Sequence, residues 1–277
     1  MGTAKGVFVL MQKGVTARSF IQIILIVLLI VAALVSFPSS SFAILNIEAL
    51  RLRQMDRQQG GNIGFRFERR EGNTDNSRFR VDAQAMKKVN SYEHMALIES
   101  EFGESNNLKD VDRAMIHLRS TYPFEKKFSA EVYGQLERNQ FTRISPRFVL
   151  GTGARARWAN EETFKVFSGI GGFWSQETIQ SAPLTTDAGT RELWRANIYI
   201  SLMYKFDENI GISTVTYYQP VINDLRDTRV LQTTQADFRV NKLISFSVFY
   251  TLNYDSRPAQ TVQKRDLHYG TMLNFVF

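Results

Sequence analysis

The sequence predicts an all-β fold, a transmembrane antiparallel up-and-down β-barrel of about 12 strands. Three observations point to it. Apolar and polar side chains alternate along a dozen segments, the last of these segments ends the chain on Phe277, and an export signal begins it. The composition agrees, with 21 Phe and 10 Tyr but a slightly negative mean hydropathy. Many aromatic residues without overall hydrophobicity indicate strands that are apolar on one face only.

The first 43 residues are expected to be a signal peptide, which directs the chain to export. An apolar block at 20–35 is followed by Ser41-Phe42-Ala43, and three basic residues precede it, namely Lys5, Lys13 and Arg18. This order is typical of a cleaved signal, so we place the cut after Ala43. An uncleaved membrane anchor is the less favoured alternative, because the block is shorter than the roughly 20 residues of a spanning helix. Residues 44–61 would then form a periplasmic N-terminal tail, helical over 44–60.

The cysteine content and the charge bear on disulfides, on metal sites and on nucleic-acid binding. The chain has no cysteine, which excludes disulfides and Cys-ligated metals. Its net charge is +7, and without residues 1–43 it keeps 31 basic against 27 acidic residues, a net charge of +4. This excess is weak and dispersed, and no basic run is interleaved with stacking aromatic residues, so no nucleic-acid partner is expected.

The barrel is expected to occupy residues 62–277, where side chains alternate with a period of two. In one segment Ile244, Phe246 and Val248 alternate with Ser245 and Ser247. Each segment is long enough for a tilted strand to cross a bilayer, which takes about 9 to 11 residues. The twelve segments are 62–70, 77–88, 93–102, 111–121, 127–138, 146–158, 163–175, 191–206, 209–218, 228–240, 243–254 and 264–277. The two faces of the third segment are hard to tell apart.

The connections between these segments are expected to alternate in length. The second, fourth, sixth, eighth and tenth are short, whereas the third, fifth, seventh, ninth and eleventh are longer. Only the first connection, EGNTDN, breaks the rule by being short. Short turns on one side, longer loops on the other and an even strand number are typical of an outer-membrane β-barrel.

The two strand faces predict which side of the barrel meets lipid. A soluble sandwich or soluble barrel would bury the apolar face inside. We favour a membrane barrel because the apolar face is rich in aromatic residues near the strand ends, as an interfacial girdle is. The opposite face carries long charged side chains, which are expected to line the lumen. These lumen charges are Arg66, Arg78, Arg80, Glu131, Arg147, Arg155, Arg157, Arg195, Arg229, Asp237 and Arg239.

The last strand is expected to close the barrel by pairing with the first. Tyr269, Leu273, Phe275 and Phe277 share its apolar face. An aromatic last residue after such a pattern resembles the signal read by the outer-membrane barrel assembly machinery, so this machinery and outer-membrane lipid are the expected partners. The alternative, an edge strand of a soluble sheet, would leave an apolar edge exposed to aggregation.

The order of several segments resembles a bacterial family of unknown function, number 481, whose members are described as salt-induced outer-membrane or YdiY-like proteins. The hallmark is a strand followed by Gly72-Asn73-Thr74-Asp75. A Gly-rich strand at 147–158, a Tyr-x-Pro segment at 217–230 and a Tyr-Asp-x-x-Pro loop at 254–266 follow in order. The resemblance covers about residues 61 to 277. It implies an outer-membrane barrel and no known activity, although the long basic start before the apolar block departs from the family pattern.

The Gly72-Asn73-Thr74-Asp75 motif is expected to be a turn. Gly and Asn tolerate positive φ, and Asn, Thr and Asp side chains bond to nearby backbone groups. The alternative is a cation held by Asp75 and loop carbonyls, but a single carboxylate is too few for a calcium site.

No catalytic, cofactor or metal site is predicted. None of the three histidines, His94, His117 and His268, has a Ser two residues later on the same strand face. The chain has no GxSxG motif and no His pair at metal spacing. The Gly-rich stretch at 169–173 lies within a strand pattern, which favours close packing or a bend. The acid pairs Glu99 with Glu101 and Asp224 with Asp227 are expected to be solvated.

We therefore expect a non-enzymatic barrel with one of two roles. On the predicted strands, inward bases outnumber inward acids, which favours a narrow passive channel that prefers small anionic solutes. The alternative is a structural barrel in which these charges pair and fill the lumen, because twelve strands fall between filled and open barrels. A surface binding protein using the longer loops is a third possibility, although the loop at 176–190 lacks aromatic anchors. A hydrolase with an unrecognised site is the least favoured reading.

Overall fold

The structure is a computed structural model that describes residues 58–70, 76–105 and 108–276. The expected signal peptide, most of the tail, the motif Gly72-Asn73-Thr74-Asp75 and Phe277 lie outside the described residues, as does the side chain of Arg66. Within the described ranges, no helix combines the length and the apolar character that crossing a membrane requires.

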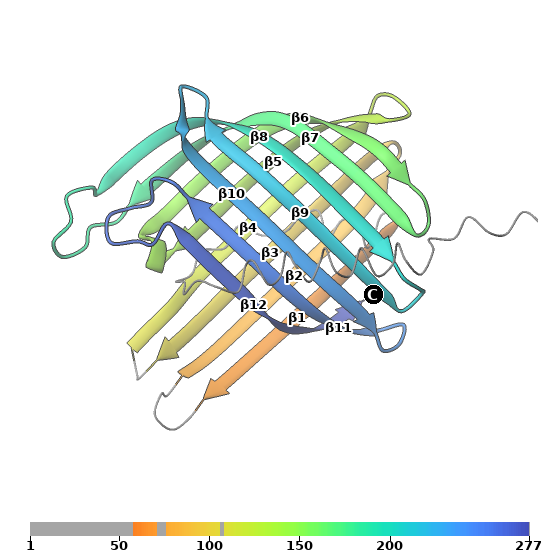
Figure 1. Cartoon of the computed structure of the whole chain (residues 1–277), viewed down its shortest axis with the longest axis horizontal. Coiled ribbons are helices and arrows are strands. Elements are labelled where there is room, and N and C mark those ends of the chain that lie inside the picture. The colour runs from red at the N-terminus through yellow and green to blue at the C-terminus, as the bar shows by residue number, and fades with distance from the viewer. Residues whose placement is uncertain (1–57, 71–75, 106–107, 277) are drawn as a thin grey trace, which may run out of the picture. The chain divides into compact units, whose positions relative to one another are not determined.

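Twelve antiparallel strands of the described chain form one closed sheet, in which each strand pairs with its neighbours in sequence and β1 pairs with β12 (Figure 1). The prediction of a closed antiparallel barrel of about 12 strands is confirmed. The strands are β1 (Gln59–Arg70), β2 (Asn76–Val89), β3 (Tyr92–Ser105), β4 (Leu108–Pro123), β5 (Phe128–Asn139), β6 (Ile144–Asn160), β7 (Phe164–Ile179), β8 (Gly189–Lys205), β9 (Ile210–Val221), β10 (Asp224–Arg239), β11 (Ile244–Asp255) and β12 (Arg265–Val276). One short 3-10 helix, η1 (Gln140–Thr142), joins β5 to β6.

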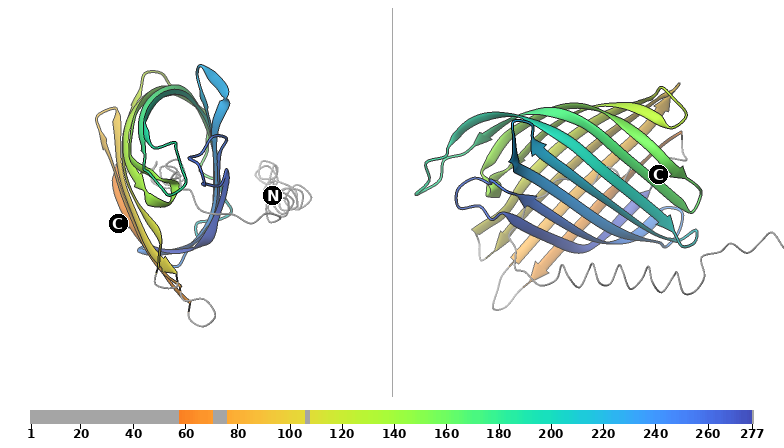
Figure 2. Two further views of the ribbon diagram at one scale, coloured as in Figure 1. Left: turned by 90° about the vertical axis from the view of Figure 1, so that its left-hand side faces the viewer. Right: turned by 45° about the horizontal axis from the view of Figure 1, so that its top comes forward.

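The first and last strands close the ring, as Figure 2 shows in the view along the barrel. Their register runs from Asn62 opposite Val276 to Phe65 opposite Leu273. The rings of Phe65 and Phe275 meet edge to face, with centroids 6.3 Å apart, on the outside of this seam. The last strand therefore pairs with the first, as its alternating pattern predicted.

The outer wall of the barrel is mainly apolar, whereas the inner wall is mainly polar but includes buried apolar clusters, such as Tyr199, Val215, Tyr217 and Leu231. On β11, for example, Ser247 is fully buried while Val248 is 43% exposed. Because alternate side chains of a strand point to opposite faces, the buried set lines the bore and the exposed set covers the outer wall. Exposed aromatic residues lie near both ends of the strands: Tyr92, Tyr122, Phe124, Phe128, Trp158, Phe164, Phe206, Phe238 and Phe246 at one end, and Phe79, Phe102, Phe148, Trp194 and Tyr218 at the other. This polarity, with two aromatic girdles, is that of a barrel that spans a bilayer.

The predicted alternation of connection lengths is only partly correct. The seventh and eleventh connections, 180–188 and 256–264, are long, as expected. The third and ninth are short instead, because β4 begins at Leu108 and β10 at Asp224, earlier than predicted. The added strand ends pair with the preceding strands across register shifts, with Lys109 opposite Glu104 and Asp224 opposite Val221. We call the end that carries the two long connections the loop end, and the opposite end the turn end.

Glycines in β6 and β7 allow large side chains to lie against the inner wall. A Cβ atom added at Gly151 would lie 2.3 Å from Cζ of Tyr133, and one at Gly169 would lie 2.1 Å from Cε1 of Tyr199. At Gly171 an added Cβ would lie 2.2 Å from the carbonyl oxygen of Thr152 on the next strand. This close approach agrees with the packing predicted for the Gly-rich stretch 169–173.

Candidate functional site: an ion-paired constriction in the bore

The half of the bore nearer the loop end contains a network of buried charges centred on Glu177 of β7. Its carboxylate is fully buried and meets three guanidinium groups. The nearest nitrogens of Arg147 and Arg191 lie 3.0 Å from its oxygens, and Nη2 of Arg229 also donates to it at 3.0 Å. Three cations around one carboxylate hold β6, β7, β8 and β10 together inside the barrel.

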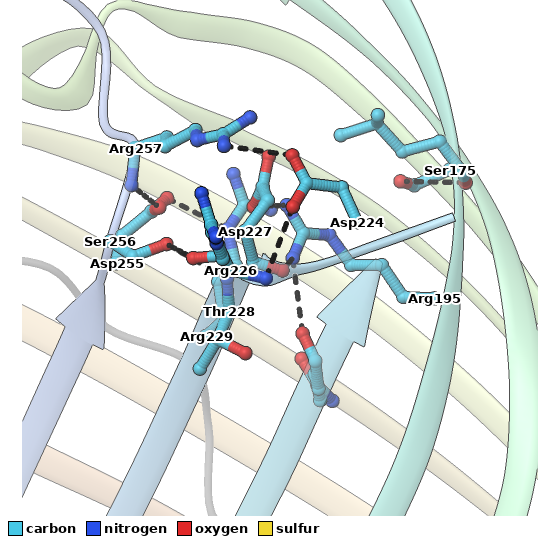
Figure 3. Close-up of polar contacts among 12 residues, drawn as sticks. Ser175, Arg195, Asp224, Arg226, Asp227, Thr228, Arg229, Asp255, Ser256 and Arg257 are labelled. Carbon is cyan, nitrogen blue, oxygen red and sulfur yellow. Dashed lines mark hydrogen bonds and ion pairs between the residues drawn. The ribbon is translucent and has the colours of Figure 1, made fainter. Parts of the chain in front are cut away.

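The network continues toward β8 and β11 (Figure 3). Nε of Arg229 donates to Asp255 at 2.8 Å. The fully buried Arg195 donates to the carboxylate of Asp227 at 2.7 Å and to the carbonyl of Gln219 at 3.0 Å. Arginine suits such positions because its planar fork donates several hydrogen bonds at once.

The start of β10 and the 256–264 connection are joined above this network (Figure 3). Nη2 of Arg257 lies 2.7 Å from Asp224, the Ser256 hydroxyl donates to the carbonyl of Arg226, and the Thr228 amide donates to the Ser256 hydroxyl. These contacts fix the strand ends that present Asp227 and Asp255 to the bore.

Two sets of contacts cross the bore between strands that are not neighbours. Glu177 on β7 and Arg229 on β10 are separated by two strands in the ring. Likewise the Tyr199 hydroxyl on β8 donates to Glu131 on β5 at 2.8 Å, and the Asn197 amide donates to the Tyr133 hydroxyl at 3.2 Å. Because such contacts run along chords of the ring, they constrict the bore. We call the residues of these two crossings, together with Arg147, Arg191 and Arg195, the constriction.

A second buried cluster lines β2, β3 and β4. Arg80 donates to Glu99 at 2.8 Å, Nη2 of Arg113 lies 3.1 Å from Glu99, and Arg113 also pairs with Glu101. The expectation that Glu99 and Glu101 are solvated is therefore wrong. The expectation also fails for Asp227, whereas Asp224 lies in an exposed pair.

The predicted lumen charges differ in how far their side chains are buried. The buried ones are Arg80, Glu131, Arg147, Arg155, Arg195 and Arg229. Arg78 and Asp237 are half-buried, whereas Arg157 and Arg239 are exposed near the turn end. Of the residues expected to form the assembly signal, Tyr269, Leu273 and Phe275 are exposed on the outer wall.

The buried charges of the described chain are close to balance, which the sequence did not predict. The buried bases are Arg80, Arg113, Arg119, Arg143, Arg147, Arg155, Lys165, Arg195 and Arg229, and the buried acids are Asp82, Glu99, Glu101, Glu131, Glu177, Asp227, Asp255 and Asp266. The buried bases therefore outnumber the buried acids only slightly, by less than the predicted inward residues indicated. Most of the missed acids lie beyond the predicted strand ends or on the segment with two similar faces.

At the turn end the bore opens into a cavity of about 420 Å³ that is mainly basic. Its charged lining comprises Lys88, Lys126, Lys127, Arg155 and Arg157, with Glu93 and Glu125 as the acids. The guanidinium of Arg155 lies over the ring of Phe167, 3.9 Å from its centroid, which holds this cation against the wall. We call this cavity the basic vestibule.

At the loop end, three connections are tied together through Arg143. Its Nη1 lies 2.8 Å from Asp187 and donates to the carbonyl of Gln260, while its Nε donates to the carbonyl of Gln180. The Gln260 amide also donates to Asp187 at 2.7 Å. This backbone hydrogen bond, with the Arg143 guanidinium, lowers the pKa of the Asp187 carboxyl below its ordinary value. We call these four residues the loop tie.

The structure also brings together one serine and one histidine that are distant in sequence. Nδ1 of His94 and Oγ of Ser120 lie 2.9 Å apart across β3 and β4, on the outer wall. Sequence inspection missed this contact because it compared residues along one strand. Within the closed sheet, β3 and β4 pair with each other and with their other neighbours along this stretch, so the His94–Ser120 contact lies over a fully paired part of the wall. In the described ranges, no group of three His, Asp or Glu residues could hold a metal ion.

Comparison with known proteins gives a family. No curated protein matches the chain. Solved structures with similarity include a NanC porin (8% identity, 78% of this chain and 97% of that chain, TM-score 0.44) and a KdgM porin (10%, 79% and 96%, TM-score 0.40). The translocator domain of the autotransporter NalP from Neisseria meningitidis is a third (11%, 83% and 94%, TM-score 0.44). At these values the similarities say nothing about what this chain does. The sequence model described as "Protein of unknown function, DUF481" matches residues 63–277, and the chain belongs to this family.

Proposed function

We propose that the protein is an integral β-barrel of the bacterial outer membrane whose bore is a narrow passage for small solutes. The observation that carries this proposal is the constriction, where Glu177 and Arg229 join strands across a bore whose buried lining is mainly polar. Fixed charges in a narrow, polar bore admit small hydrated solutes and exclude large ones. The longer connections at the loop end favour an orientation with this end outside the cell.

The route to the membrane is part of the same proposal. The signal peptide at 1–43 would export the chain, and the assembly machinery would read the outward face of the last strand, at Tyr269, Leu273, Phe275 and Phe277. Outer-membrane lipid would then cover the apolar outer wall, between its two aromatic girdles. Induction by salt, which the resemblance to family members implied, stays a prediction.

The preferred solutes would be small anions, and the basic vestibule supports this choice better than the constriction does. In the constriction each buried arginine meets a carboxylate, so little net field remains there. In the vestibule, five basic side chains face two acidic ones. A site of one dominant sign raises the local concentration of counter-ions.

A structural barrel is the second candidate, and the same buried ion pairs favour it. Fully paired charges can fill a bore of this size and leave no passage. Conductance of the purified full-length protein in planar bilayers distinguishes the two. We expect small, discrete current steps with a weak anion preference. Complete absence of steps would favour the structural barrel, and cation selectivity would contradict the role of the basic vestibule.

A further inference from the structure

Three connections that lie far apart around the barrel meet at the loop tie. Arg143 lies between η1 and β6. Asp187 belongs to the connection 180–188, between β7 and β8, and Gln260 belongs to the connection 256–264, between β11 and β12. In the ring of strands, the β5–β6 and β11–β12 connections are half a turn apart, on opposite sides. The 2.9 Å hydrogen bond from Arg143 to the Gln260 carbonyl therefore spans the loop-end mouth of the bore.

The loop tie covers the side of the mouth that lies over the constriction. The β7–β8 connection joins the tie from within the arc of strands β6 to β11, and this arc also carries Glu177 and Arg229. The Thr186 amide donates to the Gln260 side chain at 2.9 Å, so the two long connections contact each other directly (Figure 2). Ala259, next to Gln260, is only 5% exposed, so the β11–β12 connection packs against the protein instead of extending into solvent.

One side of the loop tie is fixed to the barrel, and the other is held by few contacts. The Arg143 backbone has a positive φ of 60°, its amide donates to the Gln140 carbonyl, and its carbonyl accepts from the Gln180 amide at 2.7 Å. By contrast, no residue of the described connection 180–188 is buried. Segments with few buried contacts open locally while the rest of the fold stays intact. The connection, and not Arg143, is therefore the part that can move.

We propose that the loop tie is a lid, which closes the loop-end mouth over the constriction and opens when Arg143 is released from Asp187 and Gln260. In the closed state, the two long connections lie across the approach to the constriction. Release of Arg143 removes the ion pair to Asp187 and the hydrogen bonds to two carbonyl groups together, so the lid opens as one unit. The role of the lid rests on the proposed passage, whereas its movement can be measured without any current.

Cysteine labelling measures the opening of the lid, because the chain has no cysteine of its own. Ala259→Cys places a thiol where the side chain is buried in the closed state. A charged methanethiosulfonate should label this thiol about tenfold faster after Arg143→Asn, since a hydrogen bond to a charged group contributes at least this factor. Asn tolerates the positive φ but is too short to bridge the mouth. An equal labelling rate with and without Arg143 would overturn the proposal.

Three further variants make the labelling result specific to the lid. Arg138→Asn, at an arginine near the end of β5 whose side chain is 58% exposed, is the matched control and should leave the rate unchanged. Gln263→Cys, exposed in the same connection as Ala259, should react fast in every background. Asp187→Asn weakens the tie from the other side, and its failure to accelerate labelling of Ala259→Cys would contradict the lid. Heat-dependent gel mobility shows that each variant is folded.

Reversible cross-linking tests whether the lid controls the passage. The side chains of Thr186 and Gln260 lie 3.4 Å apart. Thr186→Cys with Gln260→Cys, joined by a short bifunctional methanethiosulfonate, locks the lid and keeps the Arg143–Asp187 pair. We expect the link to reduce the current in planar bilayers and dithiothreitol to restore it. Equal current before and after reduction would contradict a lid over the passage. Absence of current in the unaltered protein, with labelling that still responds to Arg143→Asn, would refute the passage and support the lid.

Discussion

The two ends of the bore use the same basic residue types in opposite ways. In the constriction, each arginine pairs with a carboxylate that comes from another strand. In the basic vestibule, cations outnumber acids, and the most deeply buried one, Arg155, lies against the Phe167 ring. The difference shows that the number of inward arginines does not determine the character of a bore. The acidic side chains opposite the arginines determine the outcome. Where they pair with the arginines, the ion pairs join the strands, and where they are too few, a net positive charge remains that attracts anions.

Glu177→Gln is expected to have the largest effect, a loss of unfolding free energy. It would leave the constriction with an excess of cations, as in the basic vestibule. The substitution keeps the shape of the side chain but leaves Arg147, Arg191 and Arg229 without the carboxylate that they share. Breaking a buried ion pair on one side costs roughly 3–5 kcal/mol of unfolding free energy. Urea unfolding in lipid vesicles, followed by tryptophan fluorescence, measures this loss. Glu192→Gln, at an exposed residue of β8, is the matched control and should change stability little.

Gly169→Ala, at the boundary between the constriction and the basic vestibule, is expected to lower the unfolding free energy by less. The new methyl group would overlap the ring of Tyr199, which must move and lose its hydrogen bond to Glu131. Overpacking of this kind costs about 1–3 kcal/mol. Gly134→Ala is the matched control, because a Cβ there would meet its nearest atom at 3.9 Å. Equal stability of the two variants in the same urea assay would show that this packing is unimportant.

The basic vestibule is tested by the double substitution Lys126→Gln and Lys127→Gln. Removing two of its five cations should reduce the anion-to-cation permeability ratio by about twofold, because the local field weakens while the constriction stays intact. Reversal potentials in a salt gradient measure the ratio. Lys87→Gln, at an exposed residue that does not line this cavity, should have no effect.

The smallest expected effect is a pH-dependent loss of local stability in the loop tie. The pKa of Asp187 is lowered in the folded protein, so its contribution is complete above the ordinary value of 3.8 and is lost as pH falls through the lowered value. The protection of the 180–188 amides, measured as the ratio of intrinsic to observed exchange rate at each pH, should therefore be high at neutral pH and lower in acid. Asp187→Asn should show the low protection already at neutral pH, whereas Asp207→Asn, on a short connection at the turn end, should not.

The strands were predictable because period-two alternation is a local property of the sequence. All twelve predicted segments correspond to strands, with ends that differ by a few residues. Those few residues matter, because Glu177, Asp227 and Asp255 lie just beyond the predicted ends of their strands. Polar strand ends resemble loops in sequence, so the acids that neutralise the constriction were missed.

Contacts across the bore were beyond the reach of sequence patterns. The closure of the ring and the stagger between its strands determine which residues of β7 and β10 meet. The sequence of a single strand does not contain this information. The pairing of Glu131 with Tyr199 depends on Gly169 as well, because only a residue without a side chain leaves room for the Tyr199 ring.

The most direct test of the account is the single-channel conductance of the double variant Glu177→Ala with Arg229→Ala, compared with the unaltered protein. Removing both partners deletes a crossing of the bore, while Arg147, Arg191 and Asp255 each lose one ion-pair partner. If these side chains constrict the passage, the variant will show larger current steps than the unaltered protein. Steps of equal size in the two folded proteins would contradict the claim that this pair narrows the bore.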